Sequence, residues 1–346
     1  MTEPEYRALP HISYSALAGV DKSPANLLKT MEMTESMIYG SAVDVLAFDG
    51  EDEFNNKFAL MDYKAPSDKV QAIVNSIYED SQSWGESFLL QDAVDDLLSD
   101  TIDDKILKFA KQHEYGTGGK YVWKDETIIR KVKEEGNEYF KFLKHSEGKM
   151  MLDASMNERA RNSVNTLYTH DFTQHYFNEY SGIEIYPQFP IVWKYGGKDC
   201  KSLLDILKID HNKKKIYPID LKTSFDDVMY FPYNYIKWRY YIQAAFYTKA
   251  VQYFKMTVPE LFNYTVEPFK FIVISSQNPY KPLVYNTTLA DLYNGEYGGK
   301  LQNGNEIRGF KQLIIDMEWH KEKELYQYPK EVYDKNGHLE LNVWEK

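Results

Sequence analysis

The stretch "CKSLLDILKIDHNKKKIYPIDLKTS", from Cys200 to Ser224, predicts two strands joined by a lysine-rich turn. Three acids and a lysine stand where a structural hairpin would not need them. Asp205 interrupts the apolar pattern of the first strand, and Asp220 and Lys222 end the second. These charges are either solvated groups at strand ends, which are common, or the working groups of an active site.

The spacing of the charged residues favours an active site. Asp220 and Lys222 are two apart on a strand, so both side chains point to one face, and Leu221 points to the other. Pairing in a hairpin can bring Asp205 beside Asp220, where two carboxylates repel unless a cation lies between them. Oxygen ligands select a hard ion, Mg²⁺ or Mn²⁺, over zinc. A lysine on the same face would orient a water and stabilise charge on a phosphate. The set is the minimum for metal-assisted hydrolysis of a phosphodiester.

A helix shortly after this hairpin adds two polar side chains. In "WRYYIQAAFYTKA" (238–250), Gln243 and Tyr247 are four apart and therefore project from one face of a helix. The alternative is an ordinary amphipathic helix with an aromatic stripe. Its place directly after the Asp-X-Lys strand favours a contribution to the site.

The rest of the chain predicts an α/β (α+β) fold with a mixed central sheet flanked by helices. Strands are expected over 182–195, 200–210 and 214–224, antiparallel because the links are short, and again over 269–276 and 281–289. The expected helices include one capped by Ser23 with Pro24 at its first position, a buried helix over 37–48 whose only charge is Asp44, and segments 157–178, 233–254 and 306–326. Residues 64–146 are rich in acids and lysine at helical spacing, which predicts amphipathic helices.

Composition limits the class of protein. Hydrophobic residues make up 43% of the 346 residues and aromatics 15%, enough for a packed core. A single cysteine excludes a disulfide framework and any multi-cysteine metal site. No apolar run approaches the ~20 residues that span a bilayer, and the start lacks signal-peptide features, so we expect no membrane partner and a cytoplasmic location. The net charge of −11 counts against nonspecific coating of nucleic acid, but an acidic average can hide a local basic surface.

Several ordered motifs together resemble a known family. "LLDILKID" (203–210), "IYPIDLKTS" (216–224) and "YYIQAAFYTKAV" (240–251) are similar to the signature of PD-(D/E)XK nucleases in its RecB-like form. "ISYSAL" (12–17), "KSPANLL" (22–28), "YGSAVDVLAF" (39–48) and "EFNNKFAL" (53–60) resemble the exodeoxyribonuclease VIII (RecE-like) exonucleases of phages and prophages. The resemblance covers about residues 10–60 and 180–275.

The resemblance implies roles for individual residues. Asp205, Asp220 and the Leu221 carbonyl would be metal ligands, and Lys222 would serve the attacking water. Gln243 and Tyr247 would line the site and contact DNA or brace the ligands. The neighbouring residues that could contact the DNA strand, or form a partly exposed helix face, are Lys237, Trp238, Arg239 and Tyr240.

Three positions depart from the family pattern. Asp44 stands where the family has a histidine, four residues after Gly40, and either binds the metal or pairs with a buried group. Leu204 replaces a proline, and Gln188 replaces a glutamate. Losing the histidine and the glutamate could alter metal preference or rate.

The expectation is one PD-(D/E)XK nuclease domain over 1–346, with a helical insertion at about 64–146 and a catalytic core at about 180–290. The resemblance implies a Mg²⁺-dependent exonuclease (Mn²⁺ is the other candidate) that degrades linear double-stranded DNA from its ends, 5′→3′ and without ATP. It also implies a ring-like homo-oligomer, a RecT-type annealing partner and a bacterial or phage-infected cytoplasm. The alternatives are a non-catalytic DNA- or protein-binding protein on the same fold and an endonuclease of that fold.

Overall fold

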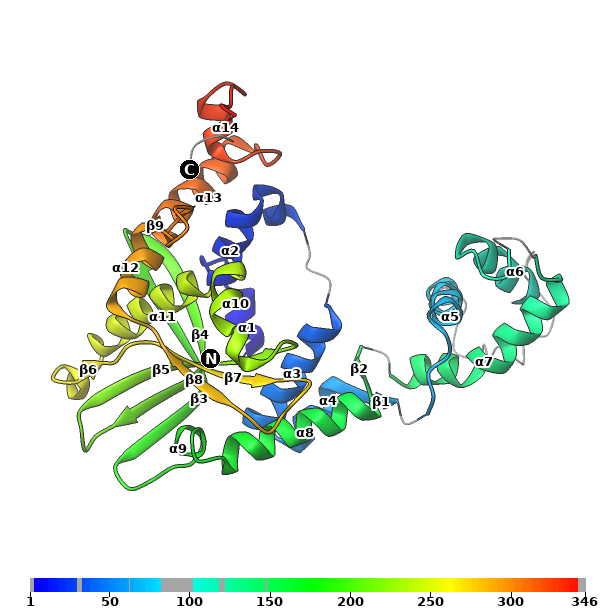
Figure 1. Ribbon diagram of the computed structural model, residues 1–346, viewed down its shortest axis with the longest axis horizontal. Helices are drawn as coiled ribbons and strands as arrows, with labels where there is room; N and C mark the ends of the chain where they lie inside the picture. The colour runs from blue at the N-terminus through cyan, green and yellow to red at the C-terminus, as the bar shows by residue number, and fades with distance from the viewer. Residues whose placement is uncertain are drawn as a thin grey trace. The chain divides into compact units, whose positions relative to one another are not determined.

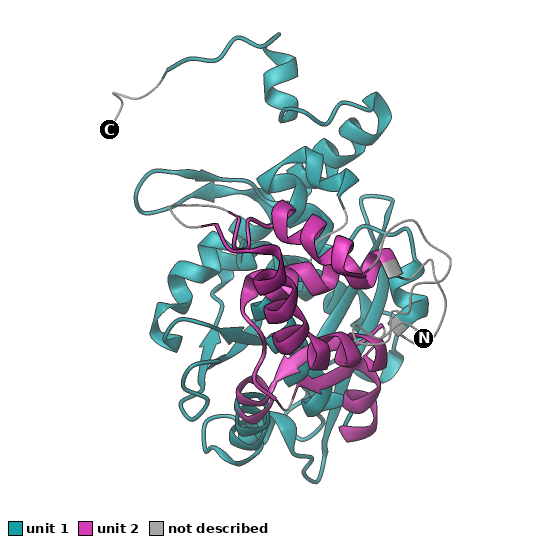
Figure 2. Cartoon of the chain, turned by 90° about the vertical axis from the view of Figure 1, so that its right-hand side faces the viewer, with its two compact units in different colours: residues 1–50, 159–346 teal, residues 51–158 magenta. Residues whose placement is uncertain are grey.

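The computed structural model describes residues 3–29, 33–61, 63–81, 102–117, 122–146 and 148–341. The chain divides into two compact units (Figure 2). Unit 1 consists of Met1–Gly50 and Arg159–Lys346, and unit 2 of Glu51–Glu158. Unit 1 contains a mixed six-stranded sheet flanked by helices (Figure 1). The predicted mixed α/β architecture is therefore confirmed.

The sheet of unit 1 has the order β3-β4-β5-β7-β8, and β6 pairs with β5. The strands are β3 (Ile183–Tyr195), β4 (Lys198–Asp210), β5 (Lys215–Ser224), β6 (Thr265–Val266), β7 (Lys270–Ser275) and β8 (Leu283–Asn286). The pairs β3–β4, β4–β5 and β7–β8 are antiparallel, whereas β5 runs parallel to β6 and β7. The three successive antiparallel strands and the two later strands of the sequence analysis are thus confirmed.

The turn between β4 and β5 shows why the hairpin closes there. Asp210 accepts a hydrogen bond from the Lys213 N–H at 2.9 Å, and Lys214 adopts the left-handed conformation with φ 55°. An aspartate side chain that bonds the backbone a few residues on is a common way to fix a turn. The third acid of the opening stretch is therefore accounted for by the turn.

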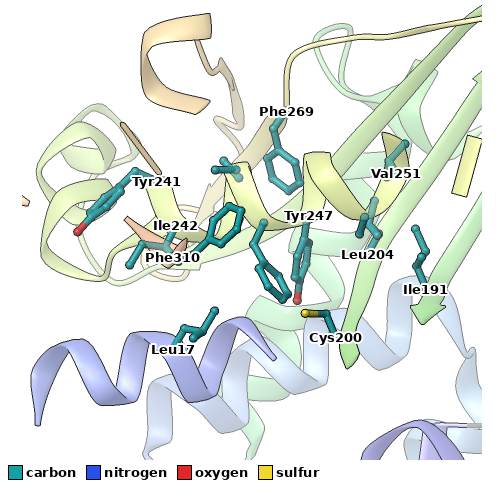
Figure 3. Close-up of a cluster of buried hydrophobic side chains, with 14 of the residues drawn as sticks. Leu17, Ile191, Cys200, Leu204, Tyr241, Ile242, Tyr247, Val251, Phe269 and Phe310 are labelled. Atoms are coloured by element: carbon teal, nitrogen blue, oxygen red, sulfur yellow. The ribbon is translucent and has the colours of Figure 1, made fainter. Parts of the chain in front are cut away.

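The remaining elements of unit 1 are mainly helices. They are α1 (Glu3–Ala8), α2 (Tyr14–Lys22), η1 (Pro24–Leu28), α3 (Glu35–Phe48), α8 (Ala154–Thr169, which begins in unit 2), α9 (Gln174–Phe177), η2 (Val228–Tyr230), α10 (Phe231–Lys237), α11 (Tyr240–Lys255), η3 (Pro259–Leu261), α12 (Leu289–Tyr297), α13 (Phe310–Lys323) and α14 (Lys330–Asp334), with the short pair β9 (Gly299–Lys300) and β10 (Glu306–Ile307). Side chains from α2, α11 and α13 form one core with β3, β4, β5 and β7. Leu204, Ile242, Tyr247 and Phe310 are among its members (Figure 3). This core fixes α11 against the sheet.

Three expected helices differ from the structure. The helix expected over 157–178 is interrupted: α8 ends at Thr169, and a turn separates it from the short α9. The helix expected over 233–254 is broken into α10 and α11, because Arg239 adopts a left-handed conformation with φ 61°. The segment after Ser23 is a short 3₁₀ helix, and Ser23 makes no side-chain cap, although Pro24 does begin the helix. The buried helix over 37–48 is present as α3, with Thr34 as its N-cap.

Unit 2 has its own helical core. Its elements are α4 (Glu51–Lys57), β1 (Phe58–Met61), α5 (Asp68–Ser81), α6 (Ile102–Gln112), α7 (Asp125–His145) and β2 (Met150–Asp153). Strands β1 and β2 pair in parallel, and α5, α6 and α7 bury a shared cluster that includes Ile73, Ile106 and Phe140. The amphipathic helices expected over 64–146 are present where the structure describes the chain, and residues 82–101 lie outside the described ranges. The insertion itself stays a prediction about domain organisation.

Among the helices of the described ranges, none is both long enough and apolar enough to cross a membrane.

Candidate active site

Asp205 and Asp220 face each other where strands β4 and β5 stop pairing. The last backbone pair is Ile206 with Ile219, and the same register continued by one step places Asp205 opposite Asp220. Beyond this pair, the N–H of Leu221 donates a hydrogen bond to the side chain of Asp205, at 2.7 Å from its Oδ2, and not to the backbone of β4. The hairpin therefore brings the two acids together, and the carboxylate itself satisfies a backbone donor at the end of the ladder.

The neighbouring strand is interrupted at the same level. In β3, Gln188 lies between the pairs Pro187 with Ile206 and Phe189 with Leu204, which places it across from Asp205. Its φ is 44°, in the left-handed region. A residue other than glycine reaches this region only when its surroundings hold it there, and such positions cluster at functional sites. The backbone is thus irregular on both sides of Asp205.

Asp220 is held by two side chains. Its carboxylate pairs with the Nζ of Lys222, and its Oδ1 accepts a hydrogen bond from Gln243 Nε2 at 2.5 Å. Asp220 is only 2% exposed and Gln243 4%, so the hydrogen bond between them is buried. Lys222 also lies over the ring of Tyr240, 4.9 Å from its centre, in a cation–π contact. The predicted residues Asp205, Asp220, Lys222 and Gln243 are therefore brought together by three elements.

The electrostatics explain why this arrangement is costly without a cation. Burial raises the pKa of Asp205 well above its usual range, and the charges of Asp220 and Asp44 add to that rise. Burial also raises the pKa of Asp220, although Lys222 and hydrogen bonds from Gln243 and Asp205 oppose the rise. For Lys222, burial alone would lower the pKa, but the charges of Asp220, Tyr240 and Asp205 outweigh it and raise the pKa. Two buried carboxyl groups this close can share a proton, or a positive ion can replace it.

Asp44 approaches the same group from helix α3. The helix comes close to β5, since a Cβ added to Gly40 would lie 3.1 Å from the Thr223 Oγ1. Burial raises the pKa of Asp44 to about 7, with Asp220 adding to the rise and Lys222 opposing it. The small residues of this helix thus let it pack near the strand that carries Asp220 and Lys222, as the sequence indicated.

Two tyrosines complete the surroundings. Tyr247, 8% exposed, has its pKa raised well above the usual range by burial and by the nearby charges of Tyr6, Asp220 and Asp205. Tyr14 packs edge-on against Tyr247 with 6.3 Å between ring centres, and burial followed by the charges of Tyr240 and Asp220 raises its pKa. Sequence reasoning assigned no role to Tyr14. Its place inside "ISYSAL", one of the motifs that carry the family resemblance, was the available signal.

The four residues expected to contact DNA separate into two groups. Tyr240 lies under Lys222, and the Arg239 guanidinium pairs with Asp21. Lys237 and Trp238 are exposed. The break between α10 and α11 is what turns these consecutive side chains in different directions.

The donors available to a metal ion are oxygens. Asp205 and Asp220 supply two neighbouring carboxyl groups, and the buried Gln243 Oε1 has no hydrogen-bond partner in the described part of the chain. Within those same ranges, no three His, Cys, Asp or Glu side chains come close enough to hold an ion. Mg²⁺ is usually bound by one or two carboxylates, with waters and substrate phosphates filling its other positions. The Asp205–Asp220 pair fits that requirement, and Asp44 lies in the same electrostatic field.

Comparison with known proteins gives little further information. No family model and no curated protein matches the sequence. One solved structure that the comparison finds is named "Putative exonuclease" and comes from Eubacterium rectale; it is 12% identical, with 91% of this chain and 97% of that chain covered, at a TM-score of 0.34. A second, SSO0001, is 11% identical over 71% of this chain and 84% of its own, at a TM-score of 0.25. Similarity at this level carries no conclusion about fold family or activity.

Proposed function

We propose that this protein is a metal-dependent exonuclease of the PD-(D/E)XK fold that acts on the ends of linear double-stranded DNA. The observation that supports the proposal most directly is the buried group in which Asp205 and Asp220 meet, with Lys222 and Gln243 on Asp220. Burying two acids and a lysine costs free energy, which a purely structural role for this irregular end of the hairpin would not require. The residues that would hold a Mg²⁺ ion are Asp205, Asp220 and the Leu221 carbonyl. Asp44 is a further candidate that would have to move closer to reach the same ion, since no three acidic side chains of the described ranges now lie close enough to share one.

Each residue has a definite task in hydrolysis of a phosphodiester. A divalent ion, when bound, polarises the phosphate and lowers the pKa of a water. The Leu221 N–H holds the carboxylate of Asp205, and Gln243 holds that of Asp220, so the two acids are positioned before substrate arrives. Lys222 orients the attacking water and stabilises negative charge as water oxygen bonds to phosphorus and the P–O bond to the leaving strand breaks. The attacking water loses its proton to solvent, and the leaving oxygen takes one from solvent.

The test is degradation of DNA with different ends. End-labelled linear duplex and closed circular DNA are incubated with the protein in Mg²⁺ or in EDTA. We expect Mg²⁺-dependent loss of the linear duplex only, and a fall of at least about 100-fold in rate for Lys222→Ala and for Asp220→Asn, since removing one transition-state contact costs about that much. Lys270→Ala is the matched control, because Lys270 lies on the adjacent strand β7 and bonds Asn286 instead of the acids.

Other outcomes point to other functions. Absence of metal-dependent degradation would remove the enzyme and leave a binding protein on this fold. Cutting of closed circles would identify an endonuclease. The proposal extends to a ring-like homo-oligomer and a RecT-type annealing partner, which mass measurement in solution and co-purification would test.

A further inference from the structure

An exposed row of aromatic and lysine side chains lies on α10 and the segments beside it. We call it the aromatic ledge and define it as Tyr230, Tyr233, Lys237 and Trp238 with Lys22 from α2. Tyr230 and Tyr233 are 65% and 67% exposed, and Trp238 is 42% exposed. Large aromatic rings held this far into solvent usually mark a place where something binds. We propose that the ledge binds the unpaired bases of single-stranded DNA. This inference rests on the proposed function and assigns a binding surface to one of the two DNA strands.

The ledge is continuous because its lysines connect its rings. Lys237 lies 5.8 Å from the centre of the Tyr233 ring and 5.0 Å from that of Trp238. Lys22, from α2, lies 4.4 Å from the centre of the same Trp238 ring. Tyr230 precedes Tyr233 by three residues, one turn of helix. Aromatic faces and ammonium groups therefore alternate along one surface.

The ledge is tied to the candidate active site by its backbone. Trp238 is two residues from Tyr240, whose ring lies under Lys222. The Trp238 carbonyl accepts a hydrogen bond from the Tyr14 hydroxyl at 3.0 Å, and the Tyr14 ring packs on Tyr247. From the middle of α10, the buried Asn234 donates a hydrogen bond to Ser224, the last residue of β5, at 3.5 Å. The ledge therefore lies beside the residues that surround Lys222, where a strand leaving the site can reach it.

Its chemistry selects single-stranded nucleic acid over a protein partner. Every base has a face that stacks on an aromatic ring, and lysines beside the rings can contact the phosphates between bases. Protein interfaces also use aromatic residues, but they are depleted of lysine at their centres. Positive charge gathers around Lys22: burial lowers its pKa and the charges of Arg239 and Lys237 lower it further, although Asp21, which pairs with Arg239, opposes them.

The two acids of the adjoining loop do not cancel this character. Asp226 accepts a hydrogen bond from Asn234 at 3.3 Å. Asp227 accepts one from the Met229 N–H at 2.8 Å, which caps the short helix η2. Both carboxylates are thus engaged in holding the loop that carries the ledge.

The experiment measures binding by fluorescence anisotropy in EDTA, so that no strand is degraded. The probes are a labelled dT12, the same length of abasic strand, and a blunt duplex. For the double variant Tyr233→Ala and Trp238→Ala, we expect affinity for dT12 to fall by roughly 10-fold to 100-fold. The wild type should bind the abasic strand as weakly as the double variant binds dT12. Tyr233→Phe, which keeps the ring, should bind like the wild type.

Tyr293→Ala is the matched control, because Tyr293 is a tyrosine of similar exposure, 61%, on helix α12 and does not belong to the ledge. Equal loss of dT12 affinity in this control, or unchanged affinity in the double variant, would overturn the inference. If the wild type degrades no DNA but the double variant still loses dT12 affinity, the proposed function fails and the ledge stands. If the wild type degrades linear duplex and dT12 affinity is independent of the ledge, only the ledge fails.

Discussion

The carboxyl group of Asp44 is costly to ionise in the metal-free protein. Burial raises its pKa to about 7, whereas an unfolded aspartate has a pKa near ~3.9. The folded state therefore binds more protons than the unfolded state between these values, and the free energy of unfolding decreases as pH rises through this window. We compare the free energy of unfolding of Asp44→Asn with that of the wild type in EDTA. Between pH 4 and pH 8, we expect this difference to shift in favour of the variant by on the order of 2–4 kcal/mol. Urea denaturation at several pH values measures it.

The control for this prediction is Glu35→Gln, because Glu35 is exposed in the first turn of the same helix and is not among the charges that shift the pKa of Asp44. It should leave the pH dependence of the wild type unchanged. A parallel pH dependence in wild type and Asp44→Asn would show that Asp44 ionises as freely as in the unfolded chain. Mg²⁺ at pH 8 should also stabilise the wild type more than Asp44→Asn if Asp44 is a ligand, and equal stabilisation would remove it from the ligand set.

At the scale of elements, the start of α11 depends on one buried carboxylate. Asp21, at the end of α2, pairs with Arg239 and accepts hydrogen bonds from Arg308 Nε at 2.9 Å and Arg308 Nη2 at 2.8 Å, the latter through its backbone carbonyl. These contacts hold Arg239 in the left-handed conformation that ends α10 and begins α11. We expect Asp21→Ala to lower the free energy of unfolding by about 2 kcal/mol, because it leaves the Arg239 guanidinium without its carboxylate and leaves Arg308 with its longer ion pair, at 3.5 Å, to Asp316. Because α11 carries Gln243, the DNA degradation rate should fall as well.

The comparison for Asp21→Ala is Glu318→Ala. Glu318 pairs with Lys198 at 2.6 Å, but both side chains are well exposed. Such surface pairs contribute ~0–1 kcal/mol, so its unfolding curve should nearly overlay that of the wild type. If the two variants lose equal stability, the Asp21 contacts are no more important than an ordinary surface pair.

The same break shows what the sequence could and could not predict. The β4–β5 hairpin follows from local patterns: apolar runs, a polar turn and an aspartate that fixes it. The meeting of Asp205 and Asp220 follows from the resulting register, and the spacing of Gln243 and Tyr247 follows from helical periodicity. The break at Arg239 was not predictable, because "YNYIKWRYY" contains neither glycine nor proline and the conformation is imposed by residues from α2 and by Arg308. Tyr14 was missed for a similar reason, since only tertiary packing brings α2 to Tyr247.

At the scale of the whole molecule, unit 2 has a hydrophobic core of its own, and we expect it to unfold independently of unit 1. Ile73, Ile106 and Phe140 are fully buried in a cluster supplied by α5, α6 and α7. A segment of roughly 100 residues with its own core can fold alone. We expect the fragment Glu51–Glu158 to give a helical circular dichroism spectrum and a cooperative thermal transition.

A core substitution then tests whether this cluster is what holds the unit. Phe140→Ala removes a buried ring and should lower the free energy of unfolding of the fragment by about 3–5 kcal/mol. Val122→Ala, at a position 69% exposed, should change it by less than ~0.5 kcal/mol. In the full chain, Phe140→Ala should move one transition to lower temperature and leave a second in place, because the core of unit 1 contains none of these residues. A single transition that moves as a whole would mean that the two units unfold together. The two units would then be separate in their packing but not in their stability.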